Sequence, residues 1–237
     1  MAGTVVVVPA RMESTRLPGK PLADICGRPL ILRVLDGVSS GDRQRFRLVV
    51  ATDSTQIEEV VIAAGYEAVL TGPAESGTHR VYDAWKALGC PGDRIVNLQG
   101  DEPFVQPAWI DALESQDMLP HSVVTLAREI PGDSGADPSS VKVVMGPGGK
   151  AMYFSRSSIP WGADFVYQHV GVYCFTPDSL SLCANSPWGI LSRQEKLEQL
   201  SWMESGVQIT VIPGVWDAMG VDTLDDLEEA RKWFRNR

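Results

Sequence analysis

The sequence contains few cysteines and lacks a long apolar run. Its four cysteines, Cys26, Cys90, Cys174 and Cys183, are scattered without a C-x-x-C pair, which argues against a disulfide framework or a zinc site. No apolar stretch approaches the ~20 residues that a membrane-spanning helix requires. No basic segment precedes the short valine run near the N-terminus, as a signal peptide would need. We therefore expect a cytoplasmic protein with reduced thiols.

The sequence also has fewer basic than acidic residues. The 21 Lys and Arg stand against 30 Asp and Glu, which gives a formal net charge of −9. Long-range repulsion then opposes binding to duplex nucleic acid or to an anionic membrane, so we expect neither partner. An anionic small substrate would have to be met by a local basic pocket or a metal. The 237 residues, 44% of them hydrophobic, are enough to bury a sizeable core.

The first motif is a cationic loop that follows a buried strand. The run Val5 to Val8 leads directly into a loop that carries Arg11, Arg16 and Lys20. A four-valine run bounded by proline is typical of a central parallel strand, and ligands of open α/β sheets bind beyond the carboxyl ends of such strands. The loop could instead be an ordinary solvated surface loop, but its placement favours a phosphate site.

The loop matches neither of two better-known phosphate motifs. Ser14 stands where the first glycine of a Walker A loop belongs, and Pro21 replaces the Ser or Thr after Lys20. The G-x-G-x-x-G fingerprint of dinucleotide-binding folds is missing too, which disfavours an NAD-dependent oxidoreductase. We expect phosphate to be held by side-chain cations more than by a glycine nest.

Strands and helices alternate over the first hundred residues, which indicates βαβ units around a parallel sheet. The pattern predicts strands at 4–8, 46–51, 67–70 and 94–98, and helices at 29–38, 54–64 and 78–88. The following half is α+β, with predicted strands at 122–130, 141–145, 151–155, 167–175 and 207–212. We also predict one helix from a capping box at Ser192 to Gly206, and a terminal helix at 224–234 capped by Thr223.

A second motif, Gln99-Gly-Asp-Glu-Pro103, follows the strand at 94–98. It should face the same crevice as the cationic loop, because both follow parallel strands. Mg²⁺ prefers one or two carboxylates together with phosphate oxygens and water, which Asp101 beside a nucleoside triphosphate would satisfy. Alternatively, Gly100 only permits a tight turn and Asp101 caps the helix that Pro107 opens.

Two further residues are ambiguous in the sequence. The period of a strand places His169 and Tyr173 on one face around Gly171. His169 is either a satisfied structural residue or part of a shallow polar pocket. Asp222 lies just outside the terminal helix, and composition alone favours a helix-end carboxylate without a further role.

Several segments together resemble the CMP-Kdo synthetases, also called 3-deoxy-manno-octulosonate cytidylyltransferases. The likeness covers nearly the whole chain. It rests on VVVVPARMESTRLPGKPL at 5–22, VVATD at 49–53, SGTHR at 76–80, VNLQGDEP at 96–103, VKVV at 141–144, YFSRSSIPW at 153–161, QHVGVY at 168–173, KLEQL at 196–200 and GVDT at 220–223.

The resemblance implies a Rossmann-like α/β nucleotidyltransferase fold of the glycosyltransferase-A type, with a mixed, mainly parallel sheet. It implies a single domain with a nucleotide-binding part at about 1–105 plus 207–237 and a sugar-binding and dimerisation part at about 106–206. The implied reaction joins CTP to 3-deoxy-D-manno-octulosonate (Kdo), using Mg²⁺, and gives CMP-Kdo and pyrophosphate for lipopolysaccharide biosynthesis. The family is usually homodimeric.

Matching motifs also imply roles for individual residues. The triphosphate would contact Arg11, Ser14, Arg16 and Lys20. The cytosine or its ribose would lie by Ser76, Gly77, Thr78 and Arg80. Asp101 and Asp222 would hold magnesium, and catalysis would depend on Arg16, Lys20 and Asp101. The sugar would be surrounded by Gln99, Arg156, His169, Tyr173, Glu198 and Gln199.

The chain departs from the family pattern at two positions. His79 replaces a usual acidic residue between Thr78 and Arg80, and Ser201 stands where Arg is common. These departures leave open the strictness of the CTP preference and a modified sugar such as 8-amino-Kdo. The sequence is also compatible with a cytidylyltransferase for a different acidic sugar, such as a sialic acid, and with a noncatalytic nucleotide-sugar binding protein.

Overall fold

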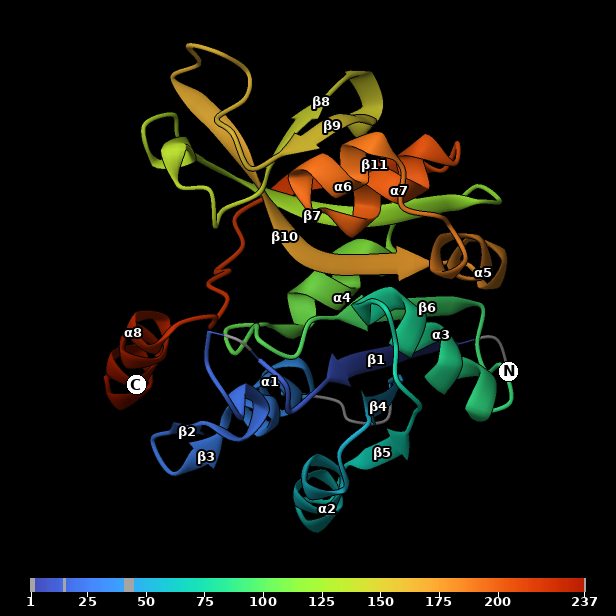
Figure 1. Ribbon diagram of the computed structural model, residues 1–237, viewed down its shortest axis with the longest axis vertical. Coiled ribbons are helices and arrows are strands. Elements are labelled where there is room, and N and C mark those ends of the chain that lie inside the picture. The colour runs from blue at the N-terminus through green and yellow to red at the C-terminus, as the bar shows by residue number, and fades with distance from the viewer. Residues whose placement is uncertain (1–2, 15, 41–44, 237) are drawn as a thin grey trace. The chain divides into compact units, whose positions relative to one another are not determined.

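The computed structural model describes residues 3–14, 16–40 and 45–236 (Figure 1). The chain forms two compact units, Met1–Asp111 with Asp217–Arg237 and Ala112–Trp216. We call them the first and the second unit. The two boundaries, at 111/112 and 216/217, lie about five and ten residues beyond those expected at about 106 and 206. No helix among the described residues is long and apolar enough to cross a membrane.

The first unit contains a parallel sheet in the order β6-β1-β4-β5. Its strands are β1 (Thr4–Ala10), β4 (Arg47–Thr52), β5 (Glu67–Leu70) and β6 (Arg94–Leu98). The valines of β1 have at most 3% of their surface exposed, as a central strand covered on both faces requires. The predicted parallel sheet is therefore confirmed, and the ends of β5 and β6 match the sequence prediction.

Helices follow these strands as the alternating pattern predicts (Figure 1). They are α1 (Leu30–Val38), α2 (Thr55–Ala63), α3 (Gly77–Ala87) and α8 (Leu224–Arg235), and α4 (Pro107–Glu114) carries the chain into the second unit. Side-chain caps set three of the starts: Ser54 for α2, Ser76 for α3 and Thr223 for α8. A short antiparallel pair, β2 (Asp24–Ile25) and β3 (Arg28–Pro29), precedes α1.

The second unit has a mixed arrangement of strands. β7 (Ser122–Pro131) lies parallel to β11 (Gln208–Gly214) and antiparallel to β10 (Phe165–Phe175). β8 (Lys142–Met145) pairs with β10 and forms a hairpin with β9 (Ala151–Ser155), close to the strands predicted at 141–145 and 151–155. Its helices are α5 (Pro177–Ala184), α6 (Ile190–Glu195) and α7 (Glu198–Glu204).

The single helix predicted from Ser192 to Gly206 is wrong, because the structure has two helices there. Lys196 adopts a left-handed conformation with φ 55° and ends α6, and Leu197 is the N-cap of α7. Ser192 is not an N-cap either. It lies inside α6, where its Oγ accepts a hydrogen bond from the backbone N–H of Gly189 at 2.8 Å.

Two glycines of the first unit allow backbone segments to approach closely. A Cβ on Gly100 would lie 2.8 Å from the carbonyl oxygen of Pro9, and one on Gly37 would lie 2.6 Å from the carbonyl oxygen of Val105. Gly100 thus serves close packing against β1 more than a tight turn. Gly37 lies inside α1, where glycine is otherwise unfavourable.

These contacts predict opposite effects of alanine at two helical glycines. Gly37→Ala should lower the free energy of unfolding by about 1–3 kcal/mol, because the added methyl group meets Val105. Gly77→Ala, whose Cβ would have only ordinary contacts from 3.7 Å, should be neutral or stabilise by about 0.4–1 kcal/mol. Urea denaturation measures both. Equal effects would contradict the close approach at Gly37.

Candidate functional site

Four charged side chains meet beyond the carboxyl ends of β1 and β6 in the first unit. The Nζ of Lys20 lies 2.7 Å from Oδ2 of Asp101 and 3.0 Å from Oδ1 of Asp222. The Nη2 of Arg16 lies 2.8 Å from Oδ2 of Asp222. We call these residues the four-charge cluster. It joins the cationic loop, the Gln99–Pro103 motif and the segment before α8, as the resemblance predicts.

Backbone and apolar contacts hold these segments together. The N–H of Val221 donates to the carbonyl of Asp101 at 2.8 Å, which places Asp222 near Asp101. Leu17, Phe104 and Val221 are buried in one apolar cluster, and each lies within three residues of a member of the four-charge cluster. Burial of these apolar side chains therefore brings the charged groups together.

The rest of the cationic loop is more exposed. Gly19 has φ 69°, and its N–H donates to the carbonyl of Met12 at 3.3 Å. This turn brings Lys20 back toward Asp101. Arg11 is exposed and Ser14 is half-buried, so the structure places both on the loop without joining them to the four-charge cluster.

Electrostatics keep Lys20 and Asp222 ionised. Burial on its own lowers the pKa of Lys20, but Asp101 and Asp222 outweigh this effect and raise it above its ordinary value. Burial likewise raises the pKa of Asp222, but Lys20 and Arg16 outweigh it, and the net pKa is lowered. At neutral pH the cluster therefore contains Lys20 as the ammonium and Asp222 as the carboxylate.

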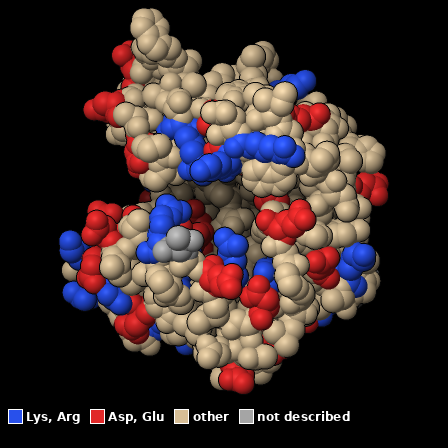
Figure 2. Space-filling model, viewed as in Figure 1, with Lys and Arg blue, Asp and Glu red and all other residues tan. Residues whose placement is uncertain are grey.

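Positive charge is local on this molecule. The face in Figure 2 has separate groups of Lys and Arg among Asp and Glu, in keeping with the net charge of −9. Within the four-charge cluster, the carboxylates of Asp101 and Asp222 supply the oxygens that could bind a metal. Among the residues that the structure describes, no group of three or more His, Cys, Asp and Glu could hold a metal.

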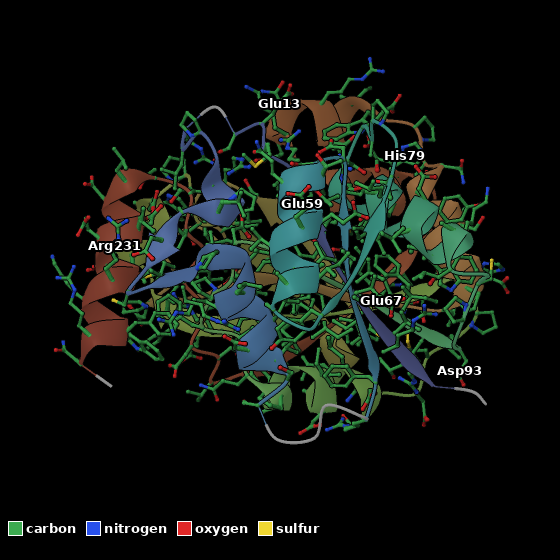
Figure 3. The ribbon with its side chains drawn as sticks, turned by 90° about the horizontal axis from the view of Figure 1, so that it is seen from below. Glu13, Glu59, Glu67, His79, Asp93 and Arg231 are labelled. Atoms are coloured by element: carbon green, nitrogen blue, oxygen red, sulfur yellow. The ribbon has the colours of Figure 1, made fainter. Side chains whose placement is uncertain are left out.

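The segment Ser76–Arg80 buries the side chains of Thr78 and Arg80. Ser76 caps α3 by accepting the N–H of His79 at 3.1 Å, and Figure 3 shows His79 in the first turn of this helix. Arg80 has only 4% of its side chain exposed, and it donates to Asp53 at 2.6 Å and to Thr71 at 2.7 Å. These bonds commit the guanidinium of Arg80 to holding the segment after β5.

A short chain of hydrogen bonds links α3 to the Gln99–Pro103 motif. Gln99 donates through Nε2 to Oδ1 of Asn97 at 3.1 Å, and Asn97 donates through Nδ2 to Oγ1 of Thr78 at 3.1 Å. Thr78 and Asn97 are fully buried. The amide of Gln99 is thus oriented from inside the first unit. Gly77 lies beside it, since a Cβ there would be 3.7 Å from the amide.

Asp101 and Asp222 both form ion pairs. The sequence leaves open that Asp101 caps the helix at Pro107 and that Asp222 is a helix-end carboxylate without a further role. The helix that Pro107 opens has Gln106 before it, so Asp101 is not its cap. The carboxylate of Asp222 accepts hydrogen bonds from Arg16 and Lys20.

His169 and Tyr173 lie together in the second unit, but in an aromatic cluster instead of a shallow polar pocket. Their ring centroids are 5.2 Å apart, and Phe154 lies edge-on to His169 at 5.3 Å. Nε2 of His169 is 2.9 Å from Oγ1 of Thr125. This bond fits a structural role for His169, and a contact of His169 with sugar stays a prediction.

Burial dominates the titration of this aromatic cluster. It lowers the pKa of His169 from 6.5 to about 3. It raises the pKa of Tyr173 well above its ordinary value, with a further contribution from the charge of Glu198. Glu198 and Gln199 begin α7, where Gln199 is buried and Glu198 is half-buried.

Several residues that contact predicted site residues were not identified from the sequence. Asp53 follows the carboxyl end of β4, which is a signal for a site residue, and it pairs with Arg80. Asn97, Lys142 and Glu195 are polar residues that contact predicted site residues. Only their tertiary contacts identify them.

Comparisons with known proteins decide the family. The family model described as Cytidylyltransferase matches residues 5–209. The 3-deoxy-manno-octulosonate cytidylyltransferase of Anaeromyxobacter dehalogenans is 41% identical over 98% of this chain and 97% of its own. That of Chlorobaculum tepidum is 41% identical over 98% of both chains. This chain belongs to the 3-deoxy-manno-octulosonate cytidylyltransferase family.

Solved structures agree with this membership. A CMP:2-keto-3-deoxy-manno-octonic acid synthetase in complex with CTP superposes with a TM-score of 0.89, at 36% identity and 99% coverage of both chains. HddC from Yersinia pseudotuberculosis, complexed with GMP-PN, shares the fold alone, with a TM-score of 0.72 at 14% identity. The predicted family and nucleotidyltransferase fold are confirmed, and the chain is a nucleotidyltransferase enzyme.

The lowered pKa of the half-buried His169 predicts an acid-sensitive contribution to the stability of this cytidylyltransferase. Its pKa of about 3 lies below the value of 6.5 expected in the unfolded chain, so the unfolded state takes up the proton first as pH falls. The free energy of unfolding should drop by about 1.4 kcal/mol per pH unit below 6.5 from this group.

The difference between the wild type and His169→Gln in urea denaturation at pH 7.5 and 5.5 measures this effect. The variant should lose less stability on acidification. NMR of the His169 ring, assigned with the same variant, should show no titration between these pH values. A ring that titrates near 6.5 would contradict its burial.

Proposed function

We propose that this protein is a Mg²⁺-dependent cytidylyltransferase that forms CMP-Kdo and pyrophosphate from CTP and Kdo. The four-charge cluster carries this proposal, because it brings two carboxylates and two cations together in a chain 41% identical to curated Kdo cytidylyltransferases. Phosphoryl-group transfer depends mainly on positioning and charge neutralisation, and this cluster has groups for both.

Arg11, Ser14, Arg16 and Lys20 would bind the triphosphate. The anomeric hydroxyl oxygen of the sugar attacks the α-phosphorus of CTP and forms a new O–P bond. The α–β phosphoanhydride bond breaks, pyrophosphate leaves, and the hydroxyl proton passes to solvent. Arg16 and Lys20 stabilise the negative charge that grows on the departing pyrophosphate. Their exposed or half-buried position on the loop supports contact with a ligand.

Asp101 and Asp222 would hold magnesium. Both carboxylates already lie within 3.0 Å of one cation, the ammonium of Lys20, so their oxygens fit a second cation with hard oxygen ligands. Two carboxylates leave positions for phosphate oxygens and water, as Mg²⁺ prefers. When bound, the metal neutralises phosphate charge and lowers the pKa of the attacking hydroxyl.

The family's motifs assign contacts with the sugar to Gln99, Arg156, His169, Tyr173, Glu198 and Gln199. The cytosine or ribose would lie beside Ser76, Gly77, Thr78 and Arg80. The side chains of Thr78 and Arg80 hydrogen-bond to other residues of the protein, so we propose that they shape this site.

We extend the proposal to a cytoplasmic homodimer that supplies the activated sugar for lipopolysaccharide biosynthesis. Within the described part of the chain, Cys26, Cys90, Cys174 and Cys183 form no disulfide bond, which supports a reducing compartment. The naming of the curated relatives supports the sugar.

Asparagine at position 101 tests the proposed reaction. Asp101→Asn keeps the shape but removes the charge from the cluster, and pyrophosphate release with CTP, Mg²⁺ and Kdo should fall about a hundredfold, or about 2.7 kcal/mol in activation free energy. The matched control is Asp93→Asn at the opposite end of β6, where Asp93 lies beside the start of β1 (Figure 3). It should keep wild-type turnover.

The same assay distinguishes the proposed reaction from a different sugar substrate and from noncatalytic binding. No release by the wild type with Kdo, 8-amino-Kdo or a sialic acid would contradict the enzymatic proposal. Release with 8-amino-Kdo or a sialic acid but not with Kdo would reassign the substrate. An Asp101→Asn variant with unchanged turnover would remove Asp101 from the metal site.

A further inference from the structure

Arg156 of the second unit is held by backbone carbonyls. Its Nε donates to the carbonyl of Glu195 at 3.1 Å, and its Nη1 donates to that of Pro138 at 3.0 Å. Among the residues that the structure describes, none accepts from its Nη2. The guanidinium is a planar fork of five N–H donors, so two fixed donors determine where the remaining ones point.

Lys142 ties together the segments that hold Arg156. Its side chain is fully buried on β8. Its Nζ donates to three carbonyls, those of Asp137 at 2.8 Å, Ser140 at 2.5 Å and Arg156 at 2.7 Å. These bonds use all three ammonium donors. The Pro138 carbonyl that binds Arg156 lies between the first two, so Lys142 fixes an acceptor of Arg156 and the Arg156 backbone at once.

Glu195 holds the same residue from α6. Its Oε2 accepts the backbone N–H of Arg156 at 2.9 Å, and its Oε1 accepts the hydroxyl of Ser155 at 2.6 Å and that of Tyr153 at 3.4 Å. Burial raises the pKa of Glu195, but these bonds and the charge of Arg156 outweigh it and lower the net value. The carboxylate is therefore ionised at neutral pH and satisfied by neighbours of Arg156.

We propose that Lys142 and Glu195 are positioning residues that orient the Arg156 guanidinium toward an anionic or hydroxyl-rich sugar. This inference rests on the proposed function, in which Arg156 contacts the sugar. Burying the ammonium of Lys142 is costly unless it is fully hydrogen-bonded, and Glu195 is half-buried. The bonds of both residues converge on Arg156, whose remaining donors are available to a ligand.

Glu195 variants test the proposal. Glu195→Ala should raise the KM for Kdo about tenfold or more and leave the KM for CTP within about twofold, because Arg156 loses its backbone anchor. Glu195→Gln should restore the KM for Kdo to within about threefold. Its carbonyl can accept from the Arg156 N–H, and its amide can donate to the hydroxyls of Ser155 and Tyr153. Lys142→Met should act like Glu195→Ala if it folds.

Glu204→Ala is the matched control. The Glu204 carboxylate also accepts three hydrogen bonds in the second unit, from Leu191 N at 2.9 Å, Ser192 N at 3.2 Å and Ser192 Oγ at 2.9 Å. Glu204→Ala should lower the melting temperature about as much as Glu195→Ala does, without a change in the KM for Kdo. Equal KM shifts in Glu195→Ala and Glu204→Ala would overturn the proposal, because the effect would then be general loosening.

A measurement without turnover keeps this inference separate from the enzymatic proposal. The Arg156 Nε–H signal in ¹⁵N NMR, assigned with Arg156→Lys, should be resolved in the wild type and in Glu195→Gln and be lost to exchange in Glu195→Ala. An unchanged signal in Glu195→Ala would overturn the positioning role. Absence of turnover in the wild type with an intact pattern of signals would instead count against the proposed substrate.

Discussion

The placement of two carboxylates around the ammonium of Lys20 is the constraint on which the first unit's site depends. Asp101 and Asp222 are remote in sequence, yet both accept from the same Nζ, at 2.7 and 3.0 Å. Two neighbouring carboxylates would repel each other without a cation. The bond from Val221 to Asp101 and the burial of Leu17, Phe104 and Val221 bring the segments together, and Lys20 makes their charges compatible.

The second unit uses buried polar groups in a different way. Lys142 and Glu195 hold Arg156 through backbone carbonyls and an N–H, and His169 is kept neutral by burial beside Thr125. Each unit therefore holds predicted site residues through hydrogen bonds to neighbours within the same unit. Such pre-organisation reduces the entropy lost when a ligand binds.

Local patterns predicted much of this structure. The valine run identified β1, the alternating pattern placed helices at 29–38 and 54–64, Thr223 was identified as the cap of α8, and the order of strands indicated a parallel sheet. The positions of Lys20, Asp101 and Asp222 followed from the family's motifs. Tertiary contacts account for the misses. The break at Lys196 needs a left-handed residue that a capping-box pattern does not reveal, and the inward bonds of Thr78, Arg80 and His169 depend on partners remote in sequence.

The coupling between Asp101 and Asp222 in metal-dependent nucleotide binding is the most direct test of a clamp shared by both carboxylates. Calorimetry would give the Kd for CTP with Mg²⁺ and with EDTA for the wild type, Asp101→Asn, Asp222→Asn and the double variant. If both hold one ion, either single change should remove most of the Mg²⁺ effect, and the second should add less than about threefold. Independent, multiplicative losses from the two changes would contradict a shared site.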